Sequence, residues 1–375
     1  MQHRALSWSL ALFVVVAGCE GDLRRTNPGA LDGGGARDSG AAPSDAAGTD
    51  AGPGGGVDAG GGGGTDAGGG CPVAMCGAAC VDTATDASNC GACGRACAAD
   101  QTCAGGMCTG GAGCPGPPAG VSADAAAALD LTNTVRAAMG APCAAMITEI
   151  NLASERHCQY YAANTGMCIA NPHAEVMGCA MFVGAQFWNR MAAAGYTGSP
   201  ASEVMAFSSD GRSSVQQWID SVWHRTPVLS PWVRDLGYGN AARCDTMDFG
   251  VGTRTPDTVV ATYPYANQTG VPTSFDGRFE GPMPPAPASG WPSGYPIHIY
   301  IKGSITTHTF TLDGSDVPID GIWLAPGDAR AMGLLSNEVI FYPNAPMTAG
   351  TRYRMRATGT NSAGAVNLDW TFTTR

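Results

Sequence analysis

The sequence lacks the short signatures of the common serine hydrolases, phosphate-loop proteins and zinc peptidases. It contains no Gly-x-Ser-x-Gly nucleophile elbow, no Gly-x-x-x-x-Gly-Lys phosphate loop and no His-Glu-x-x-His zinc helix. Positive charge is also scarce, because the 375 residues include 20 Lys and Arg against 31 Asp and Glu, a formal net charge of −11. Since no basic patch is available to neutralise phosphates, we expect no nucleic-acid partner.

Long hydrophobic runs are scarce as well. The apolar run over residues 5–17 follows a short basic start and is too short to span a bilayer. We interpret residues 1–18 as a signal peptide. Val16-Ala17-Gly18-Cys19 resembles a bacterial lipobox, in which the signal is cut before a cysteine that then carries the lipid. Cys19 is therefore the expected lipidation site and membrane anchor; a plain secretory signal with Cys19 merely nearby is the alternative.

Residues 19–70 have almost no large apolar side chains and consist mainly of Gly, Ala and Asp. Such a segment cannot bury enough surface to offset the entropy of ordering it, so we expect a lipid-anchored, disordered tether with a reach of roughly 40 Å. Asp-Ala-Gly recurs in it at a spacing of eight, but these repeats offer no hydrophobic face for stacking. The tether would present the protein in the cell envelope, as an outer-membrane or cell-surface lipoprotein.

Fifteen cysteines are present, and setting the lipidated one aside leaves an even number. In an exported chain this indicates disulfides formed in an oxidising compartment. Eight lie within Cys71–Cys108, a segment too short for a sizeable core, so we expect four disulfides of undetermined pairing there. The run Asn89–Cys97 resembles the cysteine-rich modules of the stigma-specific protein family, which implies a spacer or interaction module over residues 71–110. Zinc or redox chemistry at its Cys-Gly-Ala-Cys stretch is the alternative.

A Gly- and Pro-rich boundary at 111–120 precedes a mixed helical and strand region over residues 121–268. Helical periodicity comes first and strand patterns follow, which favours α+β layers. The expected helices are 126–139, 149–163, 185–194 and 213–222, and the expected strands are 236–240, 247–252 and 258–263. Six cysteines that could form three disulfides belong to this part of the chain: Cys114, Cys143, Cys158, Cys168, Cys179 and Cys244.

A second Pro-rich boundary, at 282–292, precedes short alternating runs separated by turn residues. This pattern predicts a small all-β sandwich over residues 290–375. The turn from Pro343 to Pro346 and the final strand Trp370–Thr374 resemble bacterial immunoglobulin-like (Ig-like) domains, which usually act as spacers or binding modules. The expected strands are 297–302, 307–312, 321–324, 338–342, 352–357 and 368–374.

Four pieces of residues 121–268 resemble, in the family's order, the CAP superfamily of cysteine-rich secretory, antigen 5 and pathogenesis-related proteins, whose domain is also called SCP-like. Two positions of the family's Gly-Glu-Asn motif differ, as do Val222 and Trp223, where bacterial members have Pro-Gly. The pieces are Asn133 to Pro142, Asn171-Pro172-His173, Gly195 to Val204, and Trp218 to Leu229 leading to Gly237-Tyr238-Gly239.

The resemblance implies an α-β-α sandwich with a cleft lined by two histidines and one or two acids that can hold a divalent metal such as zinc. Carried over by residue, His173, Glu203 and His224 are the candidate ligand-binding and metal-binding residues. Two imidazoles and a carboxylate would suit zinc and leave a position open for water. The second acid of eukaryotic members falls on Ser221, and the adjacent Asp220 would point elsewhere on a helix.

Less specific interpretations remain open for these residues. His173 could be a solvated loop residue, His224 could complement a helix dipole, and Glu203 could be a structural partner of either. His157 is expected to pack or to face solvent, and a cysteine nucleophile paired with a histidine is disfavoured by the even cysteine count. No chemistry is assigned to His298 and His308.

Three functions are compatible with these features. The favoured one is a non-enzymatic surface protein whose CAP-like cleft binds a surface, lipid or peptide ligand or a divalent metal; the resemblance implies sterol, lipid or metal binding rather than general catalysis. The second is a zinc-dependent hydrolase of peptide or cell-wall material, in which Glu203 would ligate the metal or act as base. The third is a CAP-like scaffold that carries an adhesive β-sandwich.

Overall fold

The computed structural model describes residues 74–76, 79–82, 84–87, 102–104, 107–109, 114–208, 210–242 and 244–375. The expected signal peptide, Cys19 and the tether lie outside the described residues, as does most of the expected disulfide-rich module. Of that module the structure describes two antiparallel strand pairs: β1(Ala74–Cys76) with β2(Ala79–Val81), and β3(Thr102–Ala104) with β4(Met107–Thr109).

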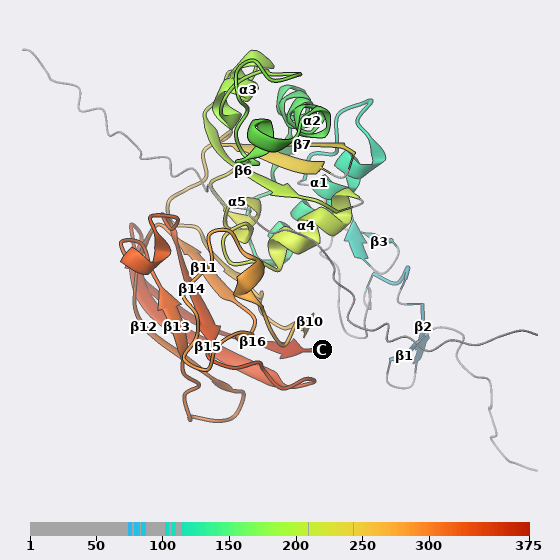
Figure 1. Ribbon diagram of the computed structural model, residues 1–375. Coiled ribbons are helices and arrows are strands. Elements are labelled where there is room, and N and C mark those ends of the chain that lie inside the picture. The colour runs from blue at the N-terminus through green and yellow to red at the C-terminus, as the bar shows by residue number, and fades with distance from the viewer. Residues whose placement is uncertain are drawn as a thin grey trace, which may run out of the picture.

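The central region has three layers, with helices on both faces of a four-stranded sheet (Figure 1). The sheet order is β5-β7-β8-β6, with β5(Ala145–Met146), β6(Pro200–Ala206), β7(Asp235–Ala241) and β8(Cys244–Gly250). Two helices, α2(Thr148–Ala163) and α3(Phe187–Ala193), lie on one side. The other side carries α1(Ala123–Ala138), α4(Gly211–Ile219) and α5(Arg225–Leu229). The mixed α/β class expected for this region is therefore observed.

Local sequence explains where these elements begin and how closely they pack. The Ser122 hydroxyl caps α1 by accepting a hydrogen bond from the Ala125 amide at 3.1 Å, and the Asp210 carboxylate caps α4 in the same way. Gly237 and Gly239 lie on β7 where the backbone of α2 crosses it, and a Cβ at either position would clash with that backbone. The Gly-x-Gly motif thus permits a close helix–sheet contact.

The Asn-x-x-Arg motif of α1 is structural. The Asn133 side chain exchanges two hydrogen bonds with the backbone of Ala144, at 2.9 and 2.8 Å. The Arg136 side chain is fully buried, and its three nitrogens donate to backbone carbonyls. These residues fix the loop after α1 against the sheet and α5.

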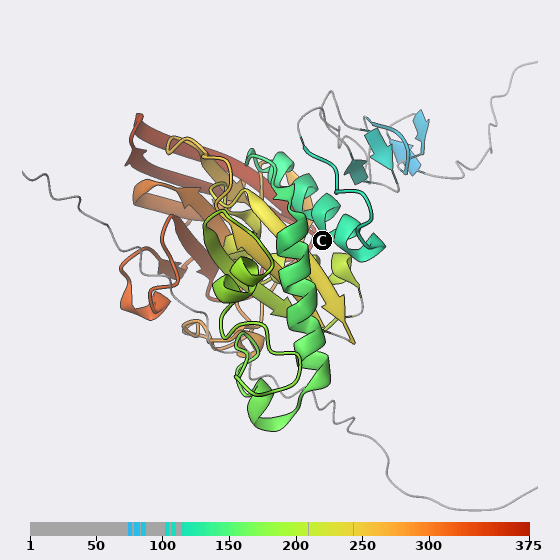
Figure 2. The same cartoon turned by 90° about the horizontal axis from the view of Figure 1, so that it is seen from above.

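The C-terminal region is all-β and forms two four-stranded sheets, which lie below the central region in Figure 1 and beside it in Figure 2. Rings from both sheets meet between them: Phe310 lies 5.4 Å from Phe341 of the other sheet and stacks on Tyr353. One sheet is β13(Gly321–Leu324), β14(Glu338–Pro343), β11(Ile297–Ile301) and β9(Val260–Tyr263); the other is β10(Gln268–Val271), β16(Gly364–Thr374), β15(Arg352–Asn361) and β12(Gly303–Leu312).

Sheet membership differs from the expectation for residues 258–268. These were expected to complete the central region, but β9 pairs antiparallel with β11, and β10 pairs parallel with β16. The alternation of Val260 to Tyr263 predicts a strand correctly, whereas the partner of a strand depends on tertiary contacts that no local pattern records. The C-terminal sheets therefore begin at Val260, well before the Pro-rich stretch.

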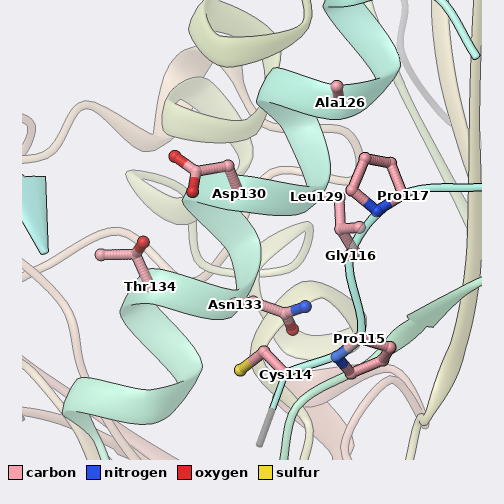
Figure 3. A pocket seen from close by; sticks show the side chains of 9 residues that line it. All are labelled: Cys114, Pro115, Gly116, Pro117, Ala126, Leu129, Asp130, Asn133 and Thr134. Carbon is pink, nitrogen blue, oxygen red and sulfur yellow. The ribbon is translucent and has the colours of Figure 1, made fainter. Parts of the chain in front are cut away.

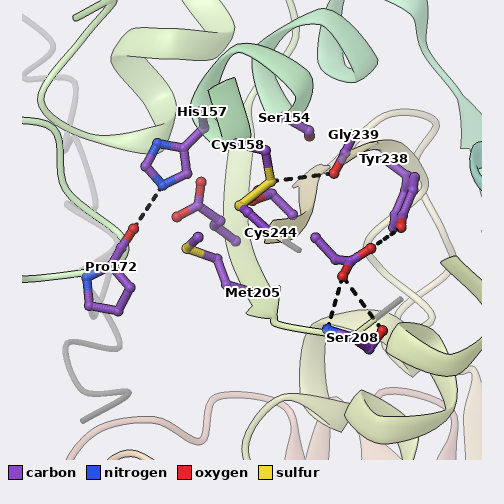
Figure 4. The surroundings of a disulfide bond; sticks show 12 residues. Ser154, His157, Cys158, Pro172, Met205, Ser208, Tyr238, Gly239 and Cys244 are labelled. Carbon is purple, nitrogen blue, oxygen red and sulfur yellow. Dashed lines mark hydrogen bonds between the residues drawn. A yellow bond between two sulfur atoms is a disulfide. The ribbon is translucent and has the colours of Figure 1, made fainter. Parts of the chain in front are cut away.

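The six cysteines of the central region form three disulfides, as the even count predicted: Cys114–Cys143, Cys158–Cys244 and Cys168–Cys179. Cys158–Cys244 is fully buried and joins α2 to β8 (Figure 4). Cys168–Cys179 closes the loop that follows α2 and its one-turn helix η1(Gly166–Ile169). No thiol among these six is available as a nucleophile.

The two regions are joined by a buried interface. Val222 and Trp223, between α4 and α5, pack with Phe275, Ile340 and Tyr342 of the C-terminal part. A second, larger apolar cluster also runs continuously from α1 and the central sheet into the β-sandwich. Across the described residues, no helix is both long enough and apolar enough to cross a membrane.

Candidate functional site

The structure brings His173 and Glu203 together. His173 follows η1 in a loop, Glu203 lies on β6, and the imidazole Nδ1 is 2.8 Å from the carboxylate Oε1. Both side chains are nearly buried, with 5% and 2% of their surfaces exposed. The contact gives His173 a fixed orientation, which a solvated loop histidine would not have.

Arg190 on α3 holds the other side of Glu203. Its Nη2 donates to the Glu203 Oε2, and its Nη1 lies within hydrogen-bond distance of the His173 carbonyl, at 3.3 Å. Burial alone would raise the pKa of Glu203, but the charge of Arg190, supported by His157 and the His173 hydrogen bond, holds it well below its usual value. Glu203 is therefore a permanently charged acceptor.

His157 and Glu175 extend this network. His157 on α2 is fully buried, its Nδ1 lies 3.0 Å from the Glu175 Oε1, and its Nε2 lies 2.8 Å from the Pro172 carbonyl (Figure 4). Glu175 Oε2 accepts hydrogen bonds from the amides of Val183 and Gly184. Burial raises the pKa of Glu175, but these hydrogen bonds outweigh it and lower the pKa overall. His157 is thus a buried, hydrogen-bonded histidine that braces the His173 loop.

Asp248 is the neighbour of Glu203 across the β6–β8 pair. Its Oδ2 accepts a hydrogen bond from the Ser154 hydroxyl at 2.8 Å, and its side chain has no exposed surface. Burial, and then the negative charge of Glu203, raises the pKa of Asp248 well above its usual value. The pKa values of the two carboxyl groups are therefore shifted in opposite directions: Arg190 favours the charged form of Glu203, whereas burial and the charge of Glu203 favour the neutral form of Asp248.

His224 has a different carboxylate partner. It precedes α5, and its Nδ1 lies 2.9 Å from the Oε1 of Glu280, which also accepts a hydrogen bond from the Trp223 amide at 2.8 Å. The side chains of His224 and Glu280 are 11% and 3% exposed. Burial would raise the pKa of Glu280, yet the charge and hydrogen bond of His224 lower it. Each candidate histidine thus contacts its own glutamate: His173 contacts Glu203, and His224 contacts Glu280.

Ser221 and Asp220 have structural roles near this second pair. The Ser221 hydroxyl accepts a hydrogen bond from the His224 amide at 2.9 Å. Asp220 accepts one from the Tyr295 hydroxyl at 2.6 Å, so its carboxylate contacts the C-terminal region. Glu280, from beyond the expected end of the CAP-like region, supplies the carboxylate in their place.

Sequence reasoning missed Glu175, Arg190, Asp248 and Glu280. Only Glu175 carried a local signal, because it follows His173 by two residues in a loop with no other charge. Arg190, Asp248 and Glu280 reach their partners through tertiary packing alone.

The described residues do not assemble a zinc site of three protein ligands. The Nδ1 atoms of His173 and His224 each face a carboxylate at hydrogen-bond distance. Within the described part of the chain, no group of three or more His, Cys, Asp or Glu side chains has the geometry to hold a metal ion. We therefore derive no chemical step through a metal here. The contacts among His173, Glu203 and Arg190 hold the His173 ring at the edge of a buried network of charged side chains.

A small cavity of about 190 Å³ lies elsewhere, between α1 and the segment that precedes it (Figure 3). Asp130 on its rim lies 3.6 Å from Arg212; burial raises the pKa of Asp130 and that arginine opposes the shift. None of the three expected site residues borders it. Its lining residues are Cys114, Pro115, Gly116, Pro117, Ala126, Leu129, Asp130, Asn133 and Thr134.

Comparisons with known proteins give matches among solved structures only. No family model matches the sequence, and no curated protein matches it. Among the solved structures that do match is an extracellular protein containing an SCP domain from Bacillus anthracis str. Ames, with 22% sequence identity and a TM-score of 0.30. The match covers 34% of this chain and 40% of that chain, so it spans less than half of either protein.

Proposed function

We propose that this is an exported, lipid-anchored surface protein whose CAP-like central region binds an apolar ligand, such as a sterol or another lipid, without catalysis. The support is the ordered set of CAP-like motifs on a layered α/β region with three disulfides. The C-terminal sheets would serve as an Ig-like spacer, and lipid on Cys19 would hold the protein at the cell envelope.

One observation carries this proposal: the loop that holds His173 is both braced and apolar at its surface. Met167, Met177 and Met181 expose 88%, 82% and 52% of their surfaces. A contiguous exposed apolar patch on a soluble protein often marks a binding site, and we infer that these three side chains of one loop form such a patch. Methionine is also suited to irregular apolar ligands, because its side chain is flexible and polarisable.

The bracing of this loop is extensive. The Cys168–Cys179 disulfide closes it, and the Tyr160 hydroxyl donates to the Cys168 carbonyl at 2.6 Å and accepts from the Val176 amide at 2.9 Å. The Asn164 side chain exchanges two further hydrogen bonds with the backbone of Ala180. A loop held this firmly loses little conformational entropy when a ligand covers it, which favours binding.

Binding to phosphatidylcholine vesicles with and without cholesterol tests the proposal. Burial of a methionine side chain contributes about 1.5–3 kcal/mol, so Met177→Asp should weaken binding about tenfold or more. Met332→Asp, which changes an exposed methionine of the C-terminal region, is the matched control and should bind like the wild type.

His173→Ala tests the ionisable part of the site, with His308→Ala on β12 as its control. We expect weaker vesicle binding only for the His173 variant, measured on protein whose thermal unfolding shows that it is folded. A folded His173→Ala protein that binds as well as the wild type would show that the His173–Glu203 pair is not needed for binding. If Met177→Asp binds vesicles as well as the wild type, the methionine-bearing loop is not the binding surface.

A further inference from the structure

A guanidinium lies buried between the central region and the C-terminal sheets, and none of the carboxylates that the structure describes forms an ion pair with it. Arg225, the first residue of α5, has no exposed surface. Its Nε donates to the Ile219 carbonyl and its Nη1 to the Pro296 carbonyl, while its Cζ lies 4.7 and 4.8 Å from the ring centres of Tyr263 and Tyr295. Among the described residues, its Nη2 has no hydrogen-bond partner.

His298 on β11 brings a second unmet polar group to the same interface. Its side chain has no exposed surface, and within the described ranges neither ring nitrogen has a hydrogen-bond partner. Side chains two apart on a strand share a face, and the hydroxyl of Tyr300, two residues on, donates to the Arg225 carbonyl at 3.2 Å. The rings of His298 and Tyr300 lie 5.8 Å apart. His298 therefore faces α5.

Arg136 is a second buried arginine, and each of its three guanidinium nitrogens has a hydrogen-bond acceptor. Its Nε, Nη1 and Nη2 donate to the carbonyls of Pro142, Val228 and Val233. A buried donor left unmet costs about 1–3 kcal/mol, and more when it belongs to a charged group. Arg225 and His298 present several such atoms to one interface, which is not what a dry, fully packed contact between two regions contains.

The acids whose charges reach this interface have other partners. Asp220 accepts the Tyr295 hydroxyl hydrogen bond at 2.6 Å. Glu338 accepts hydrogen bonds from the amides of Ser336 and Asn337, and burial raises its pKa to about 7. Burial, followed by the charge of Arg225, lowers the pKa of His298 well below its usual value, so its ring is neutral and still has one N–H to donate.

We propose that the interface between α5 and β11 is a binding site for a small monovalent anion, with chloride as the natural occupant. The Arg225 Nη2 and the N–H of His298 would both donate to it. An anion fits better than a water molecule, because the Arg225 Nη2 and one nitrogen of the neutral His298 ring can both donate to it and because the buried guanidinium needs a countercharge. The ion would act as a structural bond between the two regions of the protein.

Crystals of the full chain grown in sodium bromide test the site directly. We expect an anomalous bromide peak within hydrogen-bond distance of the Arg225 Nη2 and the His298 ring. Density at that point without an anomalous signal would assign a water molecule and overturn the proposal. Bromide found only at exposed arginines such as Arg254, which is 86% exposed, would overturn it as well.

Thermal unfolding at constant ionic strength gives an independent test. The Tm of the wild type should be higher in sodium chloride than in sodium gluconate, because an ion that binds only the folded state stabilises it. His298→Phe keeps a ring of similar size but deletes both nitrogens, so this chloride-dependent rise should disappear. His308→Phe, on the neighbouring sheet, should retain it. Equal Tm values of the wild type in the two salts would overturn the proposal. If His298→Phe does not fold, the bromide map of the wild-type crystals is the deciding measurement.

Discussion

Single residues of the central region show how a fold sets the charge state of neighbouring acids. Glu203 and Asp248 are partners on adjacent strands, yet only Glu203 has a guanidinium on it. That contact is the largest of the effects that lower the pKa of Glu203, while burial and then the charge of Glu203 favour the neutral form of Asp248. The His173 ring is oriented by the member of the pair that stays charged.

The raised pKa of Asp248 leads to a prediction about pH. An acid whose pKa is higher in the folded state stabilises the fold below its usual pKa of about 4, and this stability is lost as pH rises through the folded-state pKa. Asp248→Asn should therefore lose less stability than the wild type between pH 4 and 8. Denaturant unfolding at both pH values measures this. Asp369→Asn, at an exposed acid paired with Arg354, is the control and should not flatten the decline.

Metal content is a second prediction at this scale. Because no group of three or more His, Cys, Asp or Glu side chains among the described residues could hold a metal ion, we expect purified protein to carry no stoichiometric zinc and its Tm to be unchanged by a chelator. Elemental analysis and thermal unfolding with and without chelator provide the measurements. Stoichiometric zinc that depends on His173 would revive the zinc-dependent hydrolase as the better hypothesis.

Elements whose hydrophobic pattern repeats locally could be predicted from the sequence. The sequence predicts the helices at 123–138 and 148–163 to within three residues of their ends, and two of the four central strands, β7 and β8, to within three residues. It does not predict β5 or β6, the strand that carries Glu203. The His173–Glu203 contact was also within reach, because the motif that carries each residue is local. His224 was assigned to the same set, but its partner Glu280 lies 56 residues downstream in a Pro-rich segment with no periodicity. A contact between residues so far apart in the chain cannot be predicted from the local hydrophobic pattern around either residue.

The packing of α2 on β7 gives a prediction for one element pair. Gly239→Ala places a methyl group against the α2 backbone at Ser154 and Glu155, so the helix must move off the sheet. We expect a loss of about 1–3 kcal/mol in the free energy of unfolding, the usual effect of overpacking. Gly116→Ala, where nothing lies within 4 Å of the added carbon, is the matched control and should unfold like the wild type.

For the whole molecule, the relation between the two regions determines what can fold alone. Val222, Trp223 and Arg225 of the central region are buried by residues of the C-terminal part. The C-terminal sheets also take in strands from Val260 onward, so the expected boundaries at 268 and 290 do not coincide with the boundary between sheets. The two regions behave as one packed unit.

Deletion of residues 271–375 should therefore unfold the central region. The deletion would expose Val222 and Trp223 and remove the Pro296 carbonyl and the Tyr295 ring from Arg225, a loss of several kcal/mol by area alone. Near-ultraviolet circular dichroism and amide dispersion in NMR spectra report whether the fragment is packed. A fragment with native-like spectra would show instead that the two regions fold independently.

The Glu280–His224 contact also bears on how such a protein can diversify. A different C-terminal domain introduced by gene recombination would need an acidic residue at the position of Glu280. Without one, the His224 imidazole would lose its carboxylate partner. We therefore expect positions 224 and 280 to be substituted together among proteins that share this two-region arrangement.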